Sequence, residues 1–426
     1  MIEGDAAAQA RAAAETQWIA DSKSSLHSVW AAQLGDIVNN NNNTTAYGTA
    51  NTVFATLDSA NFPYSVLPGN HDLSVPSAGG ANFNSTFPPS RFSSRSANWH
   101  SDWSTAQYGG YLAPGQPYAL SGDPDREDMD NWGTFTAGGM NFLIINLEFG
   151  MPDSAVAWAG RILDAFPDYR AIITTHAWLE TNGSRTTSYD AVFTNLIAPR
   201  CNVFLVLSGH NHSGDNLTSG EAQRTDMHTN SACSTTPVYQ VMSDYQDRAN
   251  GSGTNSMGAL RYYVFDPDND LIHALTYSPA TDAYETDSSS RFDLAYDMAS
   301  TSTYVPLTPA RILDSRYGTG GLGVFHSHQA QGFTVRGHGG VPDNAIAVTG
   351  NLTVTQQSEI GFLYIGPGAA NDPTSSNLNF PKGDDRANAV TVALSDDGKL
   401  YVTYAAPVSN TPTAHVIFDV TGYFLK

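Results

Sequence analysis

Val203-Phe204-Leu205-Val206-Leu207 leads into Gly209-His210-Asn211-His212, an apolar run that ends in a glycine and two histidines. The run is typical of a buried strand, and the glycine permits a tight turn or a close backbone approach just before the first histidine. Two histidines at positions i and i+2 of a loop are rarely needed for packing. The stretch therefore predicts a strand whose end delivers imidazoles to a site.

Three earlier segments repeat this pattern of an apolar run followed by polar residues. Ala31-Ala32-Gln33-Leu34 precedes Gly35-Asp36, Tyr64-Ser65-Val66-Leu67 precedes Gly69-Asn70-His71-Asp72, and Ala171-Ile172-Ile173 precedes His176. Taken singly, each has an ordinary explanation as a turn or as a core histidine at a strand end. Taken in order, they predict that Asp36, Asn70, His176, His210 and His212 meet at one rim. One carboxylate, one amide oxygen and three imidazoles suit divalent transition metals.

This order and spacing resembles the calcineurin-like metallophosphoesterases over residues 1–298. The resemblance implies an α/β fold of two packed β-sheets flanked by helices. It also implies a hydrolase that cleaves a phosphate ester with two divalent metal ions (Mn, Fe or Zn), a bridging water as nucleophile and a histidine as general acid.

The resemblance gives each predicted site residue a role. Asp36 matches the ligand that bridges both metals, and Asn70, His176 and His210 match the rest of one metal site. His212 matches a ligand of the other site. His71 matches the acid that protonates the leaving group, a role suited to a pKa near neutrality.

Two positions depart from the family pattern. An Asp-x-His or Asp-x-Gln motif after the first strand normally supplies two further ligands, and residues 1–35 hold no strand ending in one. Asp5 is too close to the expected helix, which covers residues 5–26, to supply the missing ligands. We therefore expect a chain that lacks its first strand and has an incomplete second metal site. Asn39 stands where some relatives carry an acid, and a neutral side chain stabilises an imidazolium less.

A chain of 426 residues is natural for two domains. Residues 299–303, Ala-Ser-Thr-Ser-Thr, are typical of a linker. Short strands broken by turn residues then predict a separate all-β domain over 304–426, a sandwich or a barrel. Its two ends, 306–316 and 415–424, resemble an accessory domain of secreted actinobacterial proteins. The alternative function is therefore a catalytically impaired fragment whose β-domain binds carbohydrate or a cell surface.

Charge and composition bear on partners and location. The net charge is −21, so a nucleic-acid polyanion would meet no basic patch, and we expect a small-molecule phosphate ester instead. A nuclease would share the ligand set, but the charge pattern does not favour it. We expect a secreted or cell-surface bacterial protein. No signal peptide is visible, although a lost start would have removed it, and no run of about 18 apolar residues predicts a membrane span.

Three further expectations concern local structure. Cys201 and Cys233 flank the ligand loop, and either a disulfide or two separate thiols would fit. Residues 76–135 are rich in Pro, Gly and aromatic residues, which fits a long loop forming either a substrate-side rim or a structural cap. Helices are also expected near 46–60 and at 153–166, and a β-hairpin over 260–277 is expected to close the first domain.

Overall fold

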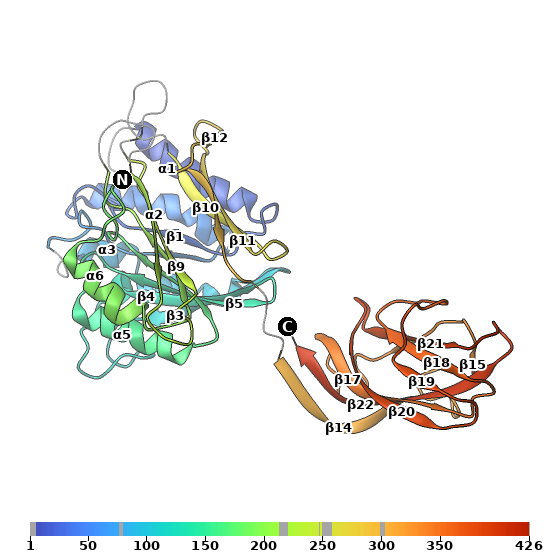
Figure 1. Ribbon diagram of the computed structural model, residues 1–426. Coiled ribbons are helices and arrows are strands. Elements are labelled where there is room, and N and C mark those ends of the chain that lie inside the picture. Colours follow the sequence, from blue (N-terminus) through green and yellow to red (C-terminus); the bar gives the residue numbers. More distant parts are fainter. Residues whose placement is uncertain are drawn as a thin grey trace. The chain divides into compact units, whose positions relative to one another are not determined.

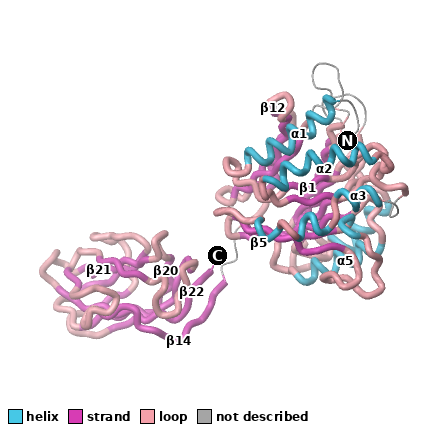
Figure 2. The backbone as a smooth tube through the Cα atoms, turned by 180° about the vertical axis from the view of Figure 1, so that it is seen from behind, coloured by secondary structure: helices cyan, strands magenta, loops and turns pink. Residues whose placement is uncertain are grey.

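The computed structural model describes residues 6–75, 80–212, 220–246, 248, 258–298 and 303–425. The chain divides into two compact units, residues 1–299 and 300–426. The first unit is mixed α/β with several sheets, and the second is β-rich (Figures 1 and 2). Of the expected linker, residues 299–302 lie outside the described residues, and Thr303 already belongs to a strand. Among the described residues, no helix is both long and apolar enough to cross a membrane.

The first unit is built on a seven-stranded sheet with the order β3-β4-β5-β6-β7-β9-β8. Strands β5, β6, β7 and β9 run parallel to one another, so their C-terminal ends share one edge of the sheet. The strands are β3 (Ser104–Tyr111), β4 (Asn131–Ala137), β5 (Met140–Leu147), β6 (Arg170–Thr175), β7 (Val203–Ser208), β8 (Glu221–Met227) and β9 (Pro237–Ser243).

Each face of this sheet is buried by different elements, because successive residues of a strand point to opposite faces. Leu143 and Ile145 of β5 pack in one cluster with Trp158 and Ile162 of α5 (Asp153–Ala165). The same cluster takes in the segment formed by α6 (Thr187–Val192) and a π-helical turn at Phe193–Ile197. Phe142 and Ile144 face the other way and belong to a second cluster, which includes α2 (Thr44–Ser59). Helices α1 (Ala6–Ser22) and α2 lie side by side (Figure 1).

The layer on this second face contains two small sheets, where the sequence predicted a single sheet. One is the parallel pair of β1 (Ala31–Gln33) and β2 (Tyr64–Val66). The other consists of β10 (Leu260–Asp266), β11 (Leu271–Ser278), β12 (Ala283–Glu285) and β13 (Arg291–Ala295). The ring centroid of Phe142 lies 5.3 Å from that of Phe265 on β10, which packs this sheet against the main one. The expectation that the hairpin closes the domain was wrong, since β12 and β13 both follow it and pair with β11.

Residues 76–135 are not one long loop. They contain α3 (Ala81–Thr86), α4 (Pro89–Ser93), β3, the start of β4 and two single 3-10 turns at Ser96–Asn98 and Glu127–Met129, while residues 76–79 lie outside the described part. Six of the aromatic side chains are buried, which favours the structural cap over the substrate-side rim: Phe83, Phe87, Phe92, Trp99, Trp132 and Phe135.

The first helix ends earlier than the sequence indicated, at Ser22 instead of residue 26. The hydroxyl of Ser22 donates to the carbonyl of Trp18, and that of Ser25 donates to the carbonyl of Ser22. Serine hydroxyls that bond to nearby backbone groups compete with helix propagation.

The second unit consists of two antiparallel sheets that share one hydrophobic cluster, as in a β-sandwich. One sheet has the order β14-β22-β17-β20 with β15 beside β22, and the other has the order β16-β21-β18-β19. The strands are β14 (Thr303–Asp314), β15 (Phe325–His326), β16 (Gln331–Thr334), β17 (Ala345–Thr355), β18 (Gly361–Gly366), β19 (Leu378–Phe380), β20 (Arg386–Ala393), β21 (Lys399–Ala405) and β22 (Thr413–Leu425).

Candidate metal centre

Four of the predicted ligands follow the C-terminal ends of parallel strands. Asp36 follows β1 and Asn70 follows β2, and these two strands pair in parallel. His176 follows β6 and His210 follows β7, which form a parallel pair in the main sheet. Strand ends of the two layers therefore supply the four side chains to one place.

Two glycines allow the loops to approach this closely. A Cβ atom added to Gly35 would stand 2.6 Å from Nδ1 of His176, and one added to Gly69 would stand 2.1 Å from Oδ1 of Asp36. Contacts under 3.0 Å are too short for a side chain, so both positions must lack one. Gly35 also has φ +94°, which glycine adopts without strain.

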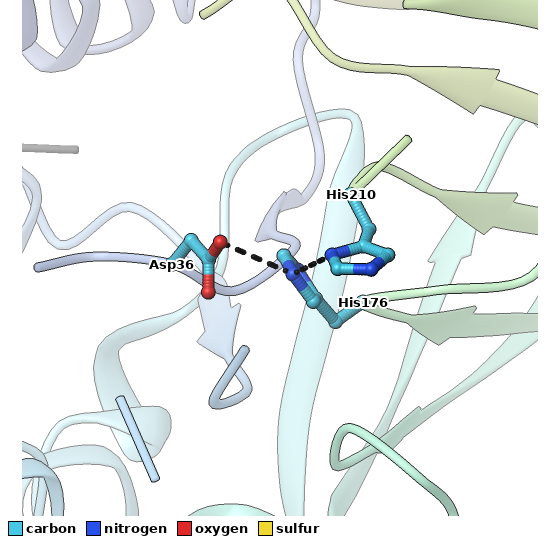
Figure 3. Close-up of side chains that lie close together, drawn as sticks. All are labelled: Asp36, His176 and His210. Carbon is cyan, nitrogen blue, oxygen red and sulfur yellow. Dashed lines mark hydrogen bonds and ion pairs between the residues drawn. The ribbon is translucent and has the colours of Figure 1, made fainter. Parts of the chain in front are cut away.

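The side chains of Asp36, Asn70 and His210 converge on Nε2 of His176, and Figure 3 shows the two histidines with Asp36. This nitrogen lies 3.3 Å from Oδ2 of Asp36, 3.1 Å from Oδ1 of Asn70 and 3.0 Å from Nδ1 of His210. The ligand atoms of Asp36, His176 and His210 all lie within 4.8 Å of one another. Within the part of the chain that the structure describes, no other group of His, Cys, Asp or Glu side chains gathers in this way.

The hydrogen bond on the far side of the His176 ring fixes its tautomer. Nδ1–H donates to the carbonyl of Leu34 at 2.7 Å, so the neutral ring presents a lone pair at Nε2. A metal-binding histidine is commonly oriented by such a bond from its other nitrogen to a backbone carbonyl. His176 is only 2% exposed, so little water competes for that lone pair.

The pKa values of the three titratable side chains are shifted by burial and by their neighbours. Burial alone would lower the pKa of His176, but the hydrogen bond and the charge of Asp36 raise it above the ordinary value. Burial alone would raise the pKa of Asp36, but its interactions with His176 and with the backbone N–H of His71 lower it. Burial and the neighbouring His176 lower the pKa of His210. A cation bound by Nε2 of His176 could also accept lone pairs from the carboxylate, the amide oxygen and the second imidazole. This donor set fits a divalent metal.

The structure places the other two predicted residues differently. His212 lies outside this group, and its Nε2 contacts Nε2 of Gln246. His71 borders the centre: its backbone N–H donates to Oδ1 of Asp36 at 2.9 Å. The Nδ1–H of its ring donates to the main-chain carbonyl of Asn39, also at 2.9 Å.

Asp72 has a structural role that the sequence did not reveal. Its carboxylate is fully buried and accepts hydrogen bonds from the backbone N–H groups of Ile37, Val38 and Gly69 and from the hydroxyl of Tyr47. Burial raises its pKa to about 6. Asp72 thus ties the loop carrying Asp36 to the loop carrying Asn70. Its partners lie up to 35 residues away, so sequence spacing gave no signal.

Two further residues at this rim were missed. Asp244 directly follows β9, the parallel neighbour of β7, and its charge acts to raise the pKa of His210. The same pattern of an apolar strand followed by a carboxylate could have identified it. Phe149 follows β5, and its ring centroid lies 5.8 Å from that of His176 and 5.5 Å from that of His210.

Comparisons with known proteins add little to this geometry. No protein-family model matches the sequence. The chain is 27% identical over 290 residues to an uncharacterized protein of Bacillus subtilis (strain 168), YvnB, a match that covers 67% of this chain. The chain spans about a fifth of that relative, since the match covers 20% of its length. A solved structure, TT1561 of Thermus thermophilus, is 13% identical and covers 64% of this chain and 91% of its own, but its TM-score of 0.28 supports no conclusion.

Proposed function

We propose that the first unit is a metal-dependent phosphoesterase of the calcineurin-like metallophosphoesterase family. The observation that carries the proposal is the convergence of Asp36, Asn70 and His210 on Nε2 of His176. Asp36, Asn70, His176 and His210 would hold a divalent cation, with Asn70 binding through its carbonyl oxygen. Such cations supply Lewis-acid polarisation of the phosphate and lower the pKa of a nucleophilic water. We propose His212 as a ligand of a second cation.

The residues around the centre have distinct roles in this proposal. The carbonyl of Leu34 keeps a proton on Nδ1 of His176, so Nε2 stays available as a ligand. The carbonyl of Asn39 does the same for His71, so the proton that His71 gives to the departing alkoxide would come from Nε2. The Asp72 carboxylate keeps the Asp36 and Asn70 loops in register.

We propose a small phosphate ester as the substrate. Asp36 carries the only charge among the four ligands, so a bound divalent cation would leave this ligand set with one positive charge, which would attract a single phosphate group. The net charge of −21 opposes association with an extended polyanion.

Metal loading followed by a phosphate-ester assay tests the proposal. The full chain is loaded with Mn²⁺, Zn²⁺ or Fe²⁺ and assayed against phosphate mono- and diesters, alongside His210→Ala and His326→Ala. We expect metal-dependent hydrolysis that His210→Ala abolishes, because it removes a ligand. His326→Ala is the matched control, since His326 lies on β15 of the second unit. Hydrolysis that survives His210→Ala, or a loaded protein that hydrolyses none of the esters, would contradict the proposal.

We further propose that the protein acts outside the cytoplasm and that its second unit serves attachment. The structure contains a disulfide between Cys201 and Cys233, which resolves the two alternatives left open by the sequence. Disulfides persist mainly in oxidising compartments. Fractionation of producing cells tests the location: the proposal expects the protein at the surface or in the medium, and recovery from the cytosol alone would contradict it.

A further inference from the structure

The second unit contains a cavity of about 340 Å³ where the edge strands of its two sheets come together. The cavity is lined by Arg311 and Ile312 of β14, by Thr334 at the end of β16 and by the loops that follow these strands. Ile312 is the extra residue of a β-bulge, because Arg311 pairs with Asp419 and Leu313 pairs with Phe418. Bulges redirect neighbouring side chains and are frequent beside binding sites.

The lining combines apolar and polar surface, and its polar side chains include Arg311 and the imidazole of His338. The guanidinium of Arg311 forms a two-point ion pair with Asp419, at 2.8 and 3.1 Å. Hydroxyls come from Thr319 and Thr334, and a Cβ added to Gly321 would meet nothing within 4 Å, so this part of the wall is open. The cavity falls in the usual range for small-molecule sites, about 300–1,000 Å³. The charge of the Arg311 guanidinium is already neutralised by Asp419, and the threonine hydroxyls are uncharged. These groups favour an uncharged ligand that both donates and accepts hydrogen bonds.

The loop that supplies Thr319 and Gly321 also presents an aromatic ring. The backbone groups of Asp314 and Thr319 exchange two hydrogen bonds of 3.1 Å, which close the loop. Tyr317 lies between them and is 79% exposed.

An ion pair between a buried carboxylate and a partly exposed guanidinium lies beside this ring. Asp314 is 2% exposed and accepts two hydrogen bonds from the guanidinium of Arg316, at 3.0 and 2.8 Å. The guanidinium carbon of Arg316 lies 5.1 Å from the ring centroid of Tyr317, within reach of a cation–π interaction. A ring that already has such a contact loses less conformational freedom when a ligand covers it than a ring without one.

We propose that this cavity and Tyr317 form a binding site for a neutral glycan. One face of a sugar ring would lie on Tyr317, and its hydroxyl groups would bond to Arg311, Asp419 and the two threonines. The charges of Arg311 and Arg316 are balanced by Asp314 and Asp419, so these two arginines offer little excess charge to an acidic polymer. The attachment role proposed for the second unit would thus lie at this cavity, with a neutral glycan as the ligand. This role does not depend on the metal centre.

Calorimetric titration of the full chain with hexasaccharides tests the site. The probes are four neutral hexamers (of glucose, xylose, mannose and N-acetylglucosamine) and acidic hexagalacturonate. We expect at least one neutral hexamer to bind with a dissociation constant below about 1 mM. We expect both Tyr317→Ala and Thr334→Trp to weaken this binding by about tenfold or more, the first by removing the ring and the second by filling the cavity.

Tyr304→Ala is the matched control. Tyr304 is 44% exposed on the same strand as Arg311, seven residues earlier and roughly 20 Å along β14. Its removal should leave glycan affinity within about twofold of the parent. Thermal melts establish that each variant is folded. The proposal is overturned if no neutral hexamer binds, if binding survives both site variants, or if hexagalacturonate binds as tightly as the neutral probes.

Discussion

The ring of His71 is held by the backbone of Asn39, not by its side chain: Nδ1–H donates to the Asn39 carbonyl at 2.9 Å. The Asn39 side chain is exposed. The sequence drew attention to that position because some relatives carry an acid there. In this chain the orienting group is a carbonyl, which any residue at position 39 would supply.

The first prediction separates the roles of these two residues. In the metal-loaded protein, His71→Ala should lower kcat for an alkyl phosphate by ~100- to 10,000-fold and for nitrophenyl phosphate far less, because nitrophenolate leaves without protonation. Asn39→Ala should change neither rate by more than about threefold, because the backbone carbonyl remains. Equal losses on both substrates would remove His71 from the role of general acid.

The second prediction concerns metal stoichiometry. Four side chains that we propose as ligands converge on one point, whereas the Nε2 of His212 contacts Gln246 instead of joining them. Dialysis against Zn²⁺ followed by elemental analysis should return nearer one than two equivalents per chain. His210→Ala should lower this value, and His326→Ala should not. Two tightly held equivalents would mean that other residues of the chain complete a second site.

The third prediction tests whether the hydrogen bonds of the Asp72 carboxylate hold together the loops that carry Asp36 and Asn70. Each of its carboxylate oxygens accepts two hydrogen bonds, so an amide nitrogen at either position would face at least one backbone N–H. Asp72→Asn should therefore lower the free energy of unfolding by about 1–3 kcal/mol. It should also weaken metal binding by about tenfold, since the two ligand loops lose their tie. Urea melts and metal titration measure the two effects, and Asp102→Asn, at an exposed site, serves as the control.

The convergence of these four side chains could be predicted because the sequence pattern at each strand end is local. An apolar run followed by a polar residue can be recognised within about ten residues, and parallel strands then bring such ends together. Asp36, Asn70, His176 and His210 meet in this way. The contacts that organise them are not local, since Asp72 reaches Ile37 and the ring of His176 reaches Leu34 across the fold.

Strand β3 was missed for a related reason. Its sequence contains Gly109 and Gly110, which weaken a strand pattern. A Cβ added to Gly109 would stand 2.4 Å from the ring of Trp132 on β4, so the glycine makes room for that ring. The strand is irregular at the same point, with a register shift between Tyr108 and Gly110. Only the partner strand explains the residue, and the partner is not visible in a local pattern.

The fourth prediction concerns pH. Asp128 is fully buried and accepts a hydrogen bond from the hydroxyl of Tyr108, and burial raises its pKa well above the ordinary value. The folded protein therefore keeps this proton at a pH where the unfolded chain, with a pKa of about 4, has lost it. The contribution of Asp128 to stability is present below about pH 4 and is lost as the pH rises towards the folded-state pKa.

Asp128→Asn removes this titration while an amide oxygen still accepts from Tyr108. The stability of the variant relative to the parent should thus increase between about pH 5 and about pH 8, by more than ~1 kcal/mol. Urea melts at the two pH values measure the difference. Asp102→Asn, which makes the same change of an acid to an amide at an exposed position, serves as the control. A difference that is constant or that decreases with pH would mean that Asp128 is ionised in the folded protein.

The last prediction concerns the disulfide between Cys201 and Cys233, which closes a segment with a sequence separation of 32 residues. That segment contains β7, the loop of His210 and β8. A link of this length restricts the unfolded chain and should contribute roughly 3–4 kcal/mol to the free energy of unfolding. The double variant Cys201→Ser/Cys233→Ser should lose about that amount in a urea melt. A reductant supplies the internal control: it should lower the melting temperature of the parent to that of the double variant and leave the variant unchanged. If the reductant destabilised both proteins equally, its effect would not come from this bond, and the link would not stabilise the ligand loop.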